Sequence, residues 1–387
     1  MTYTDTFREF VAAIPFVDHH VHQPYKRAHA ISLDAFRRPF TEGAIPAIWQ
    51  EQLQSLIGYR WMVRALATML GVSPDEYTVL AARNAMDATA YHRLLARAAH
   101  LDTCYADDLF AQGECYTVSE WAALIERPVQ RVLRIETFIE NGFAECPMLD
   151  DALAYLTQEI AAAPHRGIVS LKSIAGYRTG LAIVPPVAAH QREARAAYAR
   201  IRETAMAGGS RRIAAKPLVD AIVWAALEAA APQGLPMQFH VAFGDDDIVL
   251  RDNDPTVMRA LFRHEPFRTV PFVLLHCYPY HQHAGYLASI YPNVYVDLGL
   301  TIPIVGPRAA NILAETLELT PTRQLLASTD GHMEPEFQWF GVHVWRWAIT
   351  RLLGGYVDDG IIAAREAEEI AMAALHDNAL LIYPQHA

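Results

Sequence analysis

Histidines gather near the start of the chain, in the stretch IPFVDHHVHQPY. His20 and His22 are two residues apart at the end of an apolar, β-branched run. Side chains two apart on a strand point to the same face, so these two imidazoles can bind one cation through neutral ring nitrogens. Asp18 is expected on that face as well, where it either orients a ligand histidine or makes a capping or core hydrogen bond.

Three further polar residues end later apolar runs. His240 closes LPMQFH, His276 closes FVLLH and Asp330 closes LLASTD. Burying unpaired polar groups costs free energy, so this repeated placement predicts a shared partner, and a divalent metal ion is the partner that we expect. Nitrogen and carboxylate donors suit Zn, Mn or Fe, and we expect Zn or Mn.

Such a site predicts hydrolytic chemistry. A bound divalent ion can lower the pKa of water from 15.7 to about 7. Asp330 is then expected to take the proton during attack and to return it to the leaving group. Lys172, in IVSLKSIAGYRTGL, has three open roles: a lysine that snorkels at a strand end, an anchor for an anionic substrate, or a carbamylated ligand between two ions. One ion is expected, with a second if Lys172 is carbamylated.

The elements that would position these residues are eight short apolar runs separated by stretches of helical periodicity. This alternation predicts an α/β fold, a (β/α)8 TIM barrel, whose active site lies at the carboxyl ends of the strands. A doubly wound sheet would place a glycine-rich turn after the first strand, where this chain has histidines. The predicted strands span residues 14–20, 100–107, 129–136, 167–174, 235–241, 269–277, 293–299 and 324–330.

We expect one domain over residues 1–387 with two helical insertions. The intervals 24–99 and 178–234, after the first and fourth strands, are too long for simple crossovers and lack a linker composition. The first insertion could cover the pocket or form a dimer contact, so a homo-oligomer is possible.

Composition narrows the function classes. The chain has 387 residues, is 52% hydrophobic and carries a formal net charge of -11, which predicts a sizeable core and argues against a nucleic-acid partner. The amino terminus lacks the pattern of a secretory signal and no run of about 18 apolar residues occurs, so we expect a cytoplasmic protein without a membrane partner. The four scattered cysteines predict reduced, mostly buried thiols.

The order of these residues along the chain resembles the amidohydrolase superfamily of metal-dependent barrel hydrolases. Longer blocks look like its nodulin-type branch, which is also found fused to glutamine-synthetase-like domains in some plant and fungal proteins. The resemblance covers nearly the whole chain and is weakest across residues 24–99. The blocks are LKSIAGYRTGL, FHVAFGDDDIVLRDNDP, LLHCYPYHQHAGYLASIYPNVYVDLGL and STDGHMEPEFQWFG.

The resemblance implies roles for these residues. His20, His22 and His240 would be metal ligands, and Asp330 would be both ligand and proton shuttle. His276 would bind a second ion, or act as a general acid that polarises the substrate. A free-standing catalyst is implied, and the chemistry of the fused domain hints at γ-glutamyl or similar carboxylated amides.

Other residues could contact a small-molecule substrate. Arg178, and Arg134 with Glu136 at the end of the third strand, could bind a carboxylate and an amine, unless they form surface or structural ion pairs. His332 and the triplet 245–247 could approach the site from loops.

The leading hypothesis is metal-dependent hydrolysis of a C–N bond in a small polar amide. The alternative is a metal-dependent, non-oxidative decarboxylase of a small aromatic or unsaturated acid. A barrel that only binds a ligand is the third reading.

Overall fold

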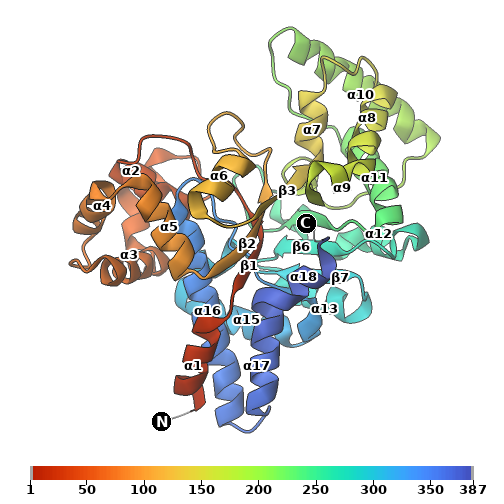
Figure 1. The fold of residues 1–387 in the computed structure, drawn as a ribbon. Coiled ribbons are helices and arrows are strands. Elements are labelled where there is room, and N and C mark those ends of the chain that lie inside the picture. Colours follow the sequence, from red (N-terminus) through yellow and green to blue (C-terminus); the bar gives the residue numbers. More distant parts are fainter. Residues whose placement is uncertain (1–2, 385–387) are drawn as a thin grey trace.

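Eight parallel strands form a barrel at the centre of the molecule (Figure 1). The computed structural model describes residues 3–384. Neighbouring strands pair in sequence order from β1 to β8, which confirms the predicted (β/α)8 architecture. The strands are β1 (Phe16–Val21), β2 (Leu101–Asp107), β3 (Val129–Arg134), β4 (Ile168–Ser173), β5 (Met237–Val241), β6 (Phe272–His276), β7 (Val294–Asp297) and β8 (Leu325–Leu326).

The last strand is shorter than predicted. The sequence suggested a strand through Asp330, but regular pairing stops at Leu326. After Leu326, backbone N–H groups donate to side-chain carboxylates instead of to the carbonyls of a neighbouring strand. The Ser328 N–H donates to Asp297 Oδ1 over 3.0 Å, and the Thr329 N–H donates to Asp18 Oδ1 over 2.9 Å. These bonds bend the segment out of strand geometry while keeping it against β1.

Two backbone hydrogen bonds join the segment after β8 to the end of β1. The Asp330 N–H donates to the His20 carbonyl over 3.1 Å, and the His22 N–H donates to the Gly331 carbonyl over 2.7 Å. The barrel therefore closes at the point where His20, His22 and Asp330 meet.

A bulge in β1 changes which side chains face inward. Asp18 pairs with Cys104 and Val21 pairs with Ala106, so β1 has one more residue than β2 between these two pairs. Such an extra residue shifts the alternation of faces, so Val17 packs inside the barrel while Val21 packs against the surrounding helices. The expectation that Asp18 shares the face of His20 is therefore wrong. Its carboxylate instead accepts a hydrogen bond from Gln338 of the outer helix α16 over 2.9 Å.

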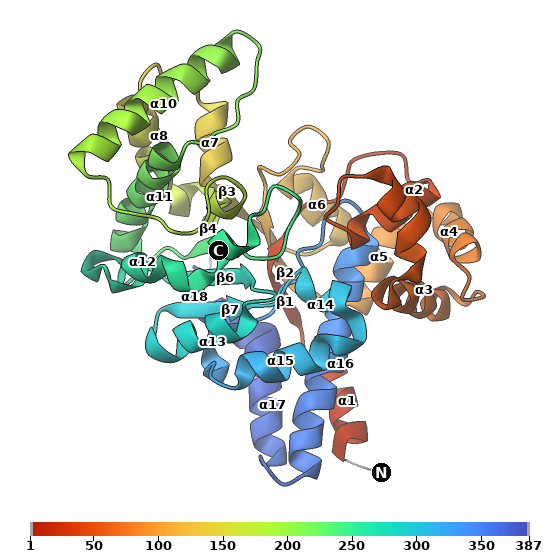
Figure 2. The ribbon, with the colours of Figure 1, turned by 180° about the vertical axis from the view of Figure 1, so that it is seen from behind.

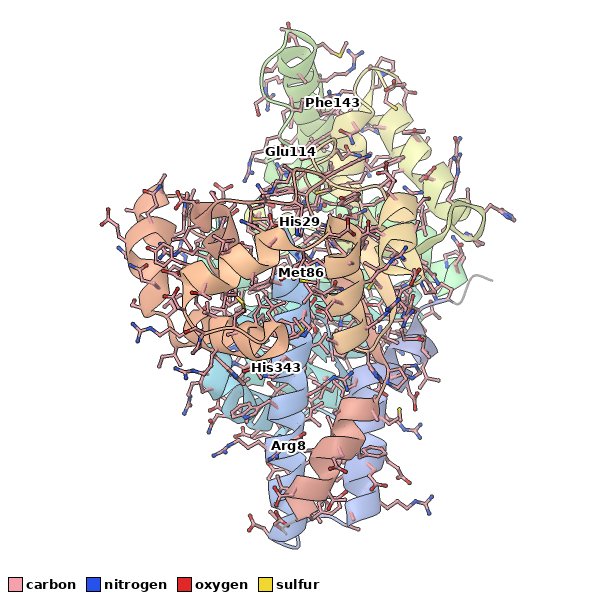
Figure 3. The ribbon with its side chains drawn as sticks, turned by 60° about the vertical axis from the view of Figure 1, so that its left-hand side comes forward. Arg8, His29, Met86, Glu114, Phe143 and His343 are labelled. Carbon is pink, nitrogen blue, oxygen red and sulfur yellow. The ribbon has the colours of Figure 1, made fainter. Side chains whose placement is uncertain are left out.

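Helical insertions follow β1 and β4, as predicted. The first carries α2–α5 on one side of the barrel, and the second carries α10 and α11 on another (Figures 1 and 2). Helix α5 contacts α16, and Figure 3 shows the first insertion lying across that helix, with His29 and Met86 on the insertion. The insertion helices are α2 (Leu33–Arg37), α3 (Ile57–Leu70), α4 (Glu76–Ala85), α5 (Ala88–Ala98), α10 (Ala188–Met206) and α11 (Lys216–Ala230).

Local sequence signals set the ends of the first insertion's helices. Helix α3 ends at Gly71, whose φ of 69° belongs to the left-handed region that glycine tolerates. Asp75 and Asp87 cap α4 and α5, because each side chain accepts a backbone N–H from the first turn over 2.9 Å.

The remaining helices surround the barrel and cover its lower end. Tyr383, after α18, packs inside the barrel with Val17 and Tyr105, so the interior is a filled core beneath the strand ends. The helices are α1 (Tyr3–Ala13), α6 (Val118–Ile125), α7 (Ile135–Asn141), α8 (Leu149–Ala161), α9 (Ala163–Arg166), α12 (Arg259–Arg263), α13 (His281–Ile290), α14 (Thr301–Val305), α15 (Ala309–Leu317), α16 (Pro335–Asp358), α17 (Ala364–Met372) and α18 (Asn378–Ile382).

The cysteines and the helix lengths bear on two further expectations. All four cysteines are free, and Cys104, Cys146 and Cys277 are buried, as predicted. Across residues 3–384, none of the helices combines the length and the hydropathy that a membrane crossing requires.

Candidate metal centre

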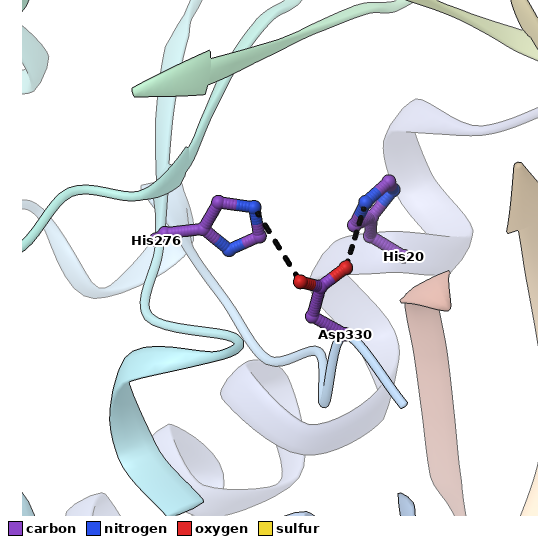
Figure 4. A group of neighbouring side chains, drawn as sticks. All are labelled: His20, His276 and Asp330. Carbon is purple, nitrogen blue, oxygen red and sulfur yellow. Dashed lines mark ion pairs between the residues drawn. The ribbon is translucent and has the colours of Figure 1, made fainter. Parts of the chain in front are cut away.

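Three imidazoles converge on the Asp330 carboxylate at the carboxyl ends of the strands. His20 Nε2 and His22 Nε2 lie 3.1 and 3.2 Å from Asp330 Oδ1, and His276 Nε2 lies 3.8 Å from Oδ2. Figure 4 shows His20 and His276 on two sides of the carboxylate. The separations match ligands of one ion, since two atoms that each lie about 2.1 Å from a metal are roughly 3 to 4 Å apart.

The backbone is strained where two of these side chains enter the site. His276 has a φ of 68° and Asp330 a φ of 52°, in the left-handed region that non-glycine residues rarely adopt. Each such residue costs about 1–3 kcal/mol and persists only where its surroundings hold it. The strain turns both side chains out of strand alternation toward the same point.

The other ring nitrogen of each histidine is held by an oxygen. His276 Nδ1 donates to the Gly299 carbonyl over 3.2 Å, and His22 Nδ1 lies 3.5 Å from the Asp107 carbonyl. His20 Nδ1 donates to Gln238 Oε1 over 2.8 Å. Because Nδ1 carries the proton in these contacts, a neutral ring presents its Nε2 lone pair to Asp330, as metal-ligating histidines do.

The histidine rings at this site are neutral, so their Nε2 atoms donate no hydrogen bond to the Asp330 carboxylate. Burial lowers the pKa of His20 to about 3 and that of His276 to about 4, so both rings are neutral. His276 Nε2 and Asp330 Oδ1 are buried with no hydrogen-bond partner. Lone pairs that face an ionised carboxylate repel it, so a cation between them fits this site.

One ligand atom from each of His20, His276 and Asp330 lies within 4.8 Å of the others, so these three residues could hold one ion. Lys172 is 2% exposed, and its Nζ lies 3.1 Å from His20 Nε2. Burial lowers the pKa of Lys172 to about 8, although the Asp107 and Asp330 carboxylates oppose this shift.

His240 lies beside this group. Its ring centroid is 4.6 Å from that of His276, and its Nε2 lies 2.8 Å from the Phe243 carbonyl oxygen. Burial lowers the pKa of His240 well below its ordinary value, so this ring is also neutral. Five of the six residues predicted as metal ligands therefore lie within contact distance of another member, and His240 stands next to His276.

A cavity of about 230 Å³ opens above the candidate ligands. His22, Lys172, His240, His276 and Asp330 all line it. His332 lines it too, and its Nδ1 donates to the Asp330 carbonyl over 2.7 Å.

The predicted substrate-binding residues divide between the cavity and the core. Arg178 lines the cavity and pairs with Glu140 over 3.2 Å, but its Nε and Nη1 atoms are buried without a partner. Arg134 also lines the cavity, where it donates to Asp107 over 2.6 and 2.8 Å. Glu136 is fully buried and lies outside the cavity lining, and its carboxylate accepts hydrogen bonds from the Ser173 hydroxyl and the Ile174 N–H, at and just after the end of β4.

Sequence reasoning missed several residues of the site. Asp107 ends a predicted strand, and Asp297 lies two residues before the end of another, so a search for polar residues at strand ends would also have found them. Arg38, Glu42 and Tyr177 also line the cavity, but they come from two short helical turns and a loop, which no periodic pattern marks.

The comparisons with known proteins agree with this geometry. A family model described as Amidohydrolase matches residues 147–385. The chain belongs to the amidohydrolase family. It is 28% identical to protein fluG of Emericella nidulans, in an alignment that covers 99% of this chain and 47% of fluG, so the chain spans about half the length of that relative.

Solved structures share the fold, and one of them supports the same family. A proposed metal-dependent hydrolase from Lactobacillus casei is 25% identical, with a TM-score of 0.86 and coverage of 97% of this chain and 96% of that chain. Uronate isomerase from Thermotoga maritima has a TM-score of 0.66 at 12% identity over 99% and 98% of the two chains, which shows the shared fold alone. The chain is therefore an enzyme of this metal-dependent hydrolase superfamily, and the nodulin-type branch stays a prediction.

Proposed function

We propose that this amidohydrolase cleaves the C–N bond of a small carboxylated amide, such as a γ-glutamyl amide. The observation that carries the proposal is Arg178, a buried guanidinium with two unpartnered donor atoms in the cavity that holds Asp330 and its histidines. Buried donors without a partner cost free energy, and a substrate carboxylate that accepts a hydrogen bond from this guanidinium would lower that cost.

His20, His22, His276 and Asp330 would hold a divalent ion, with His240 beside them, and Zn or Mn suits these donors. When bound, such an ion acts as a Lewis acid that makes water nucleophilic at neutral pH and polarises a carbonyl.

Asp330 would move the proton in this reaction. Its carboxylate is ionised, faces the cavity and is fixed by the strained backbone, so it can accept a proton from the attacking water at Oδ1 or Oδ2. It would then donate that proton to the leaving nitrogen, so that the amine departs neutral.

Lys172 keeps two roles under this proposal. As an ammonium, it would help Arg178 to anchor the substrate's carboxylate. As a carbamate, it would become a carboxylate ligand next to His20. The intact mass of the native protein separates the two roles, because a carbamate adds the mass of carbon dioxide.

The test is a turnover screen of metal-loaded protein against amides of mono- and dicarboxylic acids, which follows release of ammonia or amine. We expect turnover of carboxylated amides and its loss in Asp330→Asn, with an unchanged circular dichroism spectrum. Arg178→Ala should raise KM for carboxylated amides at least tenfold, whereas Arg212→Ala, a matched change at an exposed cation of the same cavity, should have little effect.

The decarboxylase alternative rests on the same cations. Lys172 and Arg178 would then hold the carboxylate that leaves as carbon dioxide. Release of carbon dioxide from aromatic or unsaturated acids, with no amine from any amide, would replace the hydrolytic proposal with this one.

A further inference from the structure

Glu42 is a carboxylate in the cavity without a partner. It belongs to the first insertion and follows the short helical turn η1 (Arg38–Phe40). Among residues 3–384, no hydrogen bond or ion pair engages its side chain, which is half-buried and borders the cavity. A carboxylate placed in this way remains available to a ligand.

The other acidic residues of the cavity wall are engaged. Asp247 pairs with Arg212 over 2.9 Å, and Asp245 accepts the Asp247 N–H over 2.9 Å. Asp330 faces the three histidines. Glu42 is thus the one cavity-lining carboxylate in the described residues that no protein group binds.

Arg38, whose positive charge acts on Glu42, forms no ion pair with it among the described residues. Arg38 donates to the Thr41 carbonyl, and its guanidinium lies over the Trp49 ring with its carbon 5.0 Å from the centroid. Burial raises the pKa of Glu42 to about 7, and the negative charge of Asp330 adds to this shift. A cation brought next to Glu42 would relieve both the burial cost and the repulsion.

Arg178 supplies the opposite charge in the same cavity. Its side chain is 8% exposed, and its Nε and Nη1 atoms have no partner. Its chain neighbour Tyr177 and Glu42 line the same cavity, and the charge of Glu42 helps to raise the pKa of the Tyr177 hydroxyl. One cavity is therefore lined by a guanidinium with two unpartnered nitrogens and by an unpartnered carboxylate, which together complement a zwitterion.

We propose that Glu42 binds an ammonium group of the substrate while Arg178 binds its carboxylate, so that the substrate class is a zwitterionic amino-acid amide. This inference rests on the proposed hydrolase function and narrows it. Glu42 is thereby a specificity-determining residue contributed by the insertion, and the expected amine-binding role moves from the buried Glu136 to Glu42.

The test measures binding, so it does not depend on turnover. Titration calorimetry of the metal-loaded protein would compare ligand pairs that differ only by an ammonium group: aspartate with succinate, glutamate with glutarate, and 2-aminoadipate with adipate. We expect the amino member of at least one pair to bind about tenfold more tightly. Glu42→Gln should remove that preference and leave the affinity for the plain dicarboxylate unchanged.

Asp246→Asn is the matched control, since it removes one negative charge from an exposed position near the cavity. It should keep the preference. The proposal is overturned if the wild-type protein prefers no amino ligand, or if Glu42→Gln retains the preference. Failure of the hydrolase proposal looks different, because the binding preference would persist while no amide is turned over.

Discussion

Gln238 offers a direct test of the metal centre, because it holds His20 without reaching the cavity. This fully buried residue of β5 accepts the His20 Nδ1 proton at Oε1 over 2.8 Å. Its Nε2 donates to the His19 carbonyl over 2.8 Å and to the Tyr383 hydroxyl over 3.0 Å. The amide orientation therefore fixes the tautomer that points the His20 Nε2 lone pair at Asp330.

Gln238→Leu removes that constraint at nearly constant volume. Loss of an outer hydrogen bond to a ligating histidine typically weakens metal binding about 10- to 100-fold, or by about 1.4–2.8 kcal/mol. Three hydrogen bonds are lost as well, at about 1 kcal/mol each, so the free energy of unfolding should fall by about 3 kcal/mol. We expect the protein to stay folded and to bind Zn and Mn more weakly.

The assay is competition for Zn and Mn with a fluorescent chelator, together with urea unfolding of the metal-free protein. Gln324→Leu is the matched control, because Gln324 also makes three hydrogen bonds, to the carbonyls of Ala288, Tyr291 and Val294, away from the site. It should lose similar stability and keep the wild-type metal affinity.

Two results would refute this reasoning. Wild-type metal affinity in folded Gln238→Leu would mean that His20 Nε2 does not ligate the ion. An equal loss of affinity in Gln324→Leu would mean that the effect reports general destabilisation rather than the orientation of His20.

Three further predictions concern stability. Arg83→Leu should destabilise the protein by about 3–5 kcal/mol in urea unfolding, because it leaves Glu336 buried without a cation and Glu334 with Arg27 alone. The same change at the exposed Arg365 should have little effect. Burial raises the pKa of Glu42 from 4.5 to about 7, so the folded state favours the neutral form of this carboxyl. The free energy of unfolding of the wild-type protein should therefore fall by up to about 3 kcal/mol as the pH rises from 4.5 to 7, and Glu42→Gln should not show this loss. Removal of metal by a chelator should lower Tm, and adding the ion back at 100 times its Kd should raise the free energy of unfolding by about 2.7 kcal/mol. An unchanged Tm would argue against a metal site in the folded protein.

Local patterns in the sequence predicted the framework of the site. Eight apolar runs predicted eight strands, because parallel strands covered by helices are buried on both faces. His20, Lys172 and His276 were predicted as candidates from their strand positions, and His22 from its place just after the first strand, since strand ends meet at one edge of a barrel and place distant residues together.

Only the tertiary structure decided the details that depend on contacts between distant segments. The bulge in β1 turned Asp18 toward α16, and side-chain carboxylates ended β8 before Asp330 while backbone hydrogen bonds kept that residue against His20. Glu42 entered the cavity from an irregular segment of the insertion. Periodicity reports which face of a regular element is buried, whereas loop conformation and barrel closure follow from hydrogen bonds between residues hundreds of positions apart. The sequence by itself therefore determined the barrel and most of the candidate ligands, and the folded chain decided how they face one another and which charges remain free for a substrate.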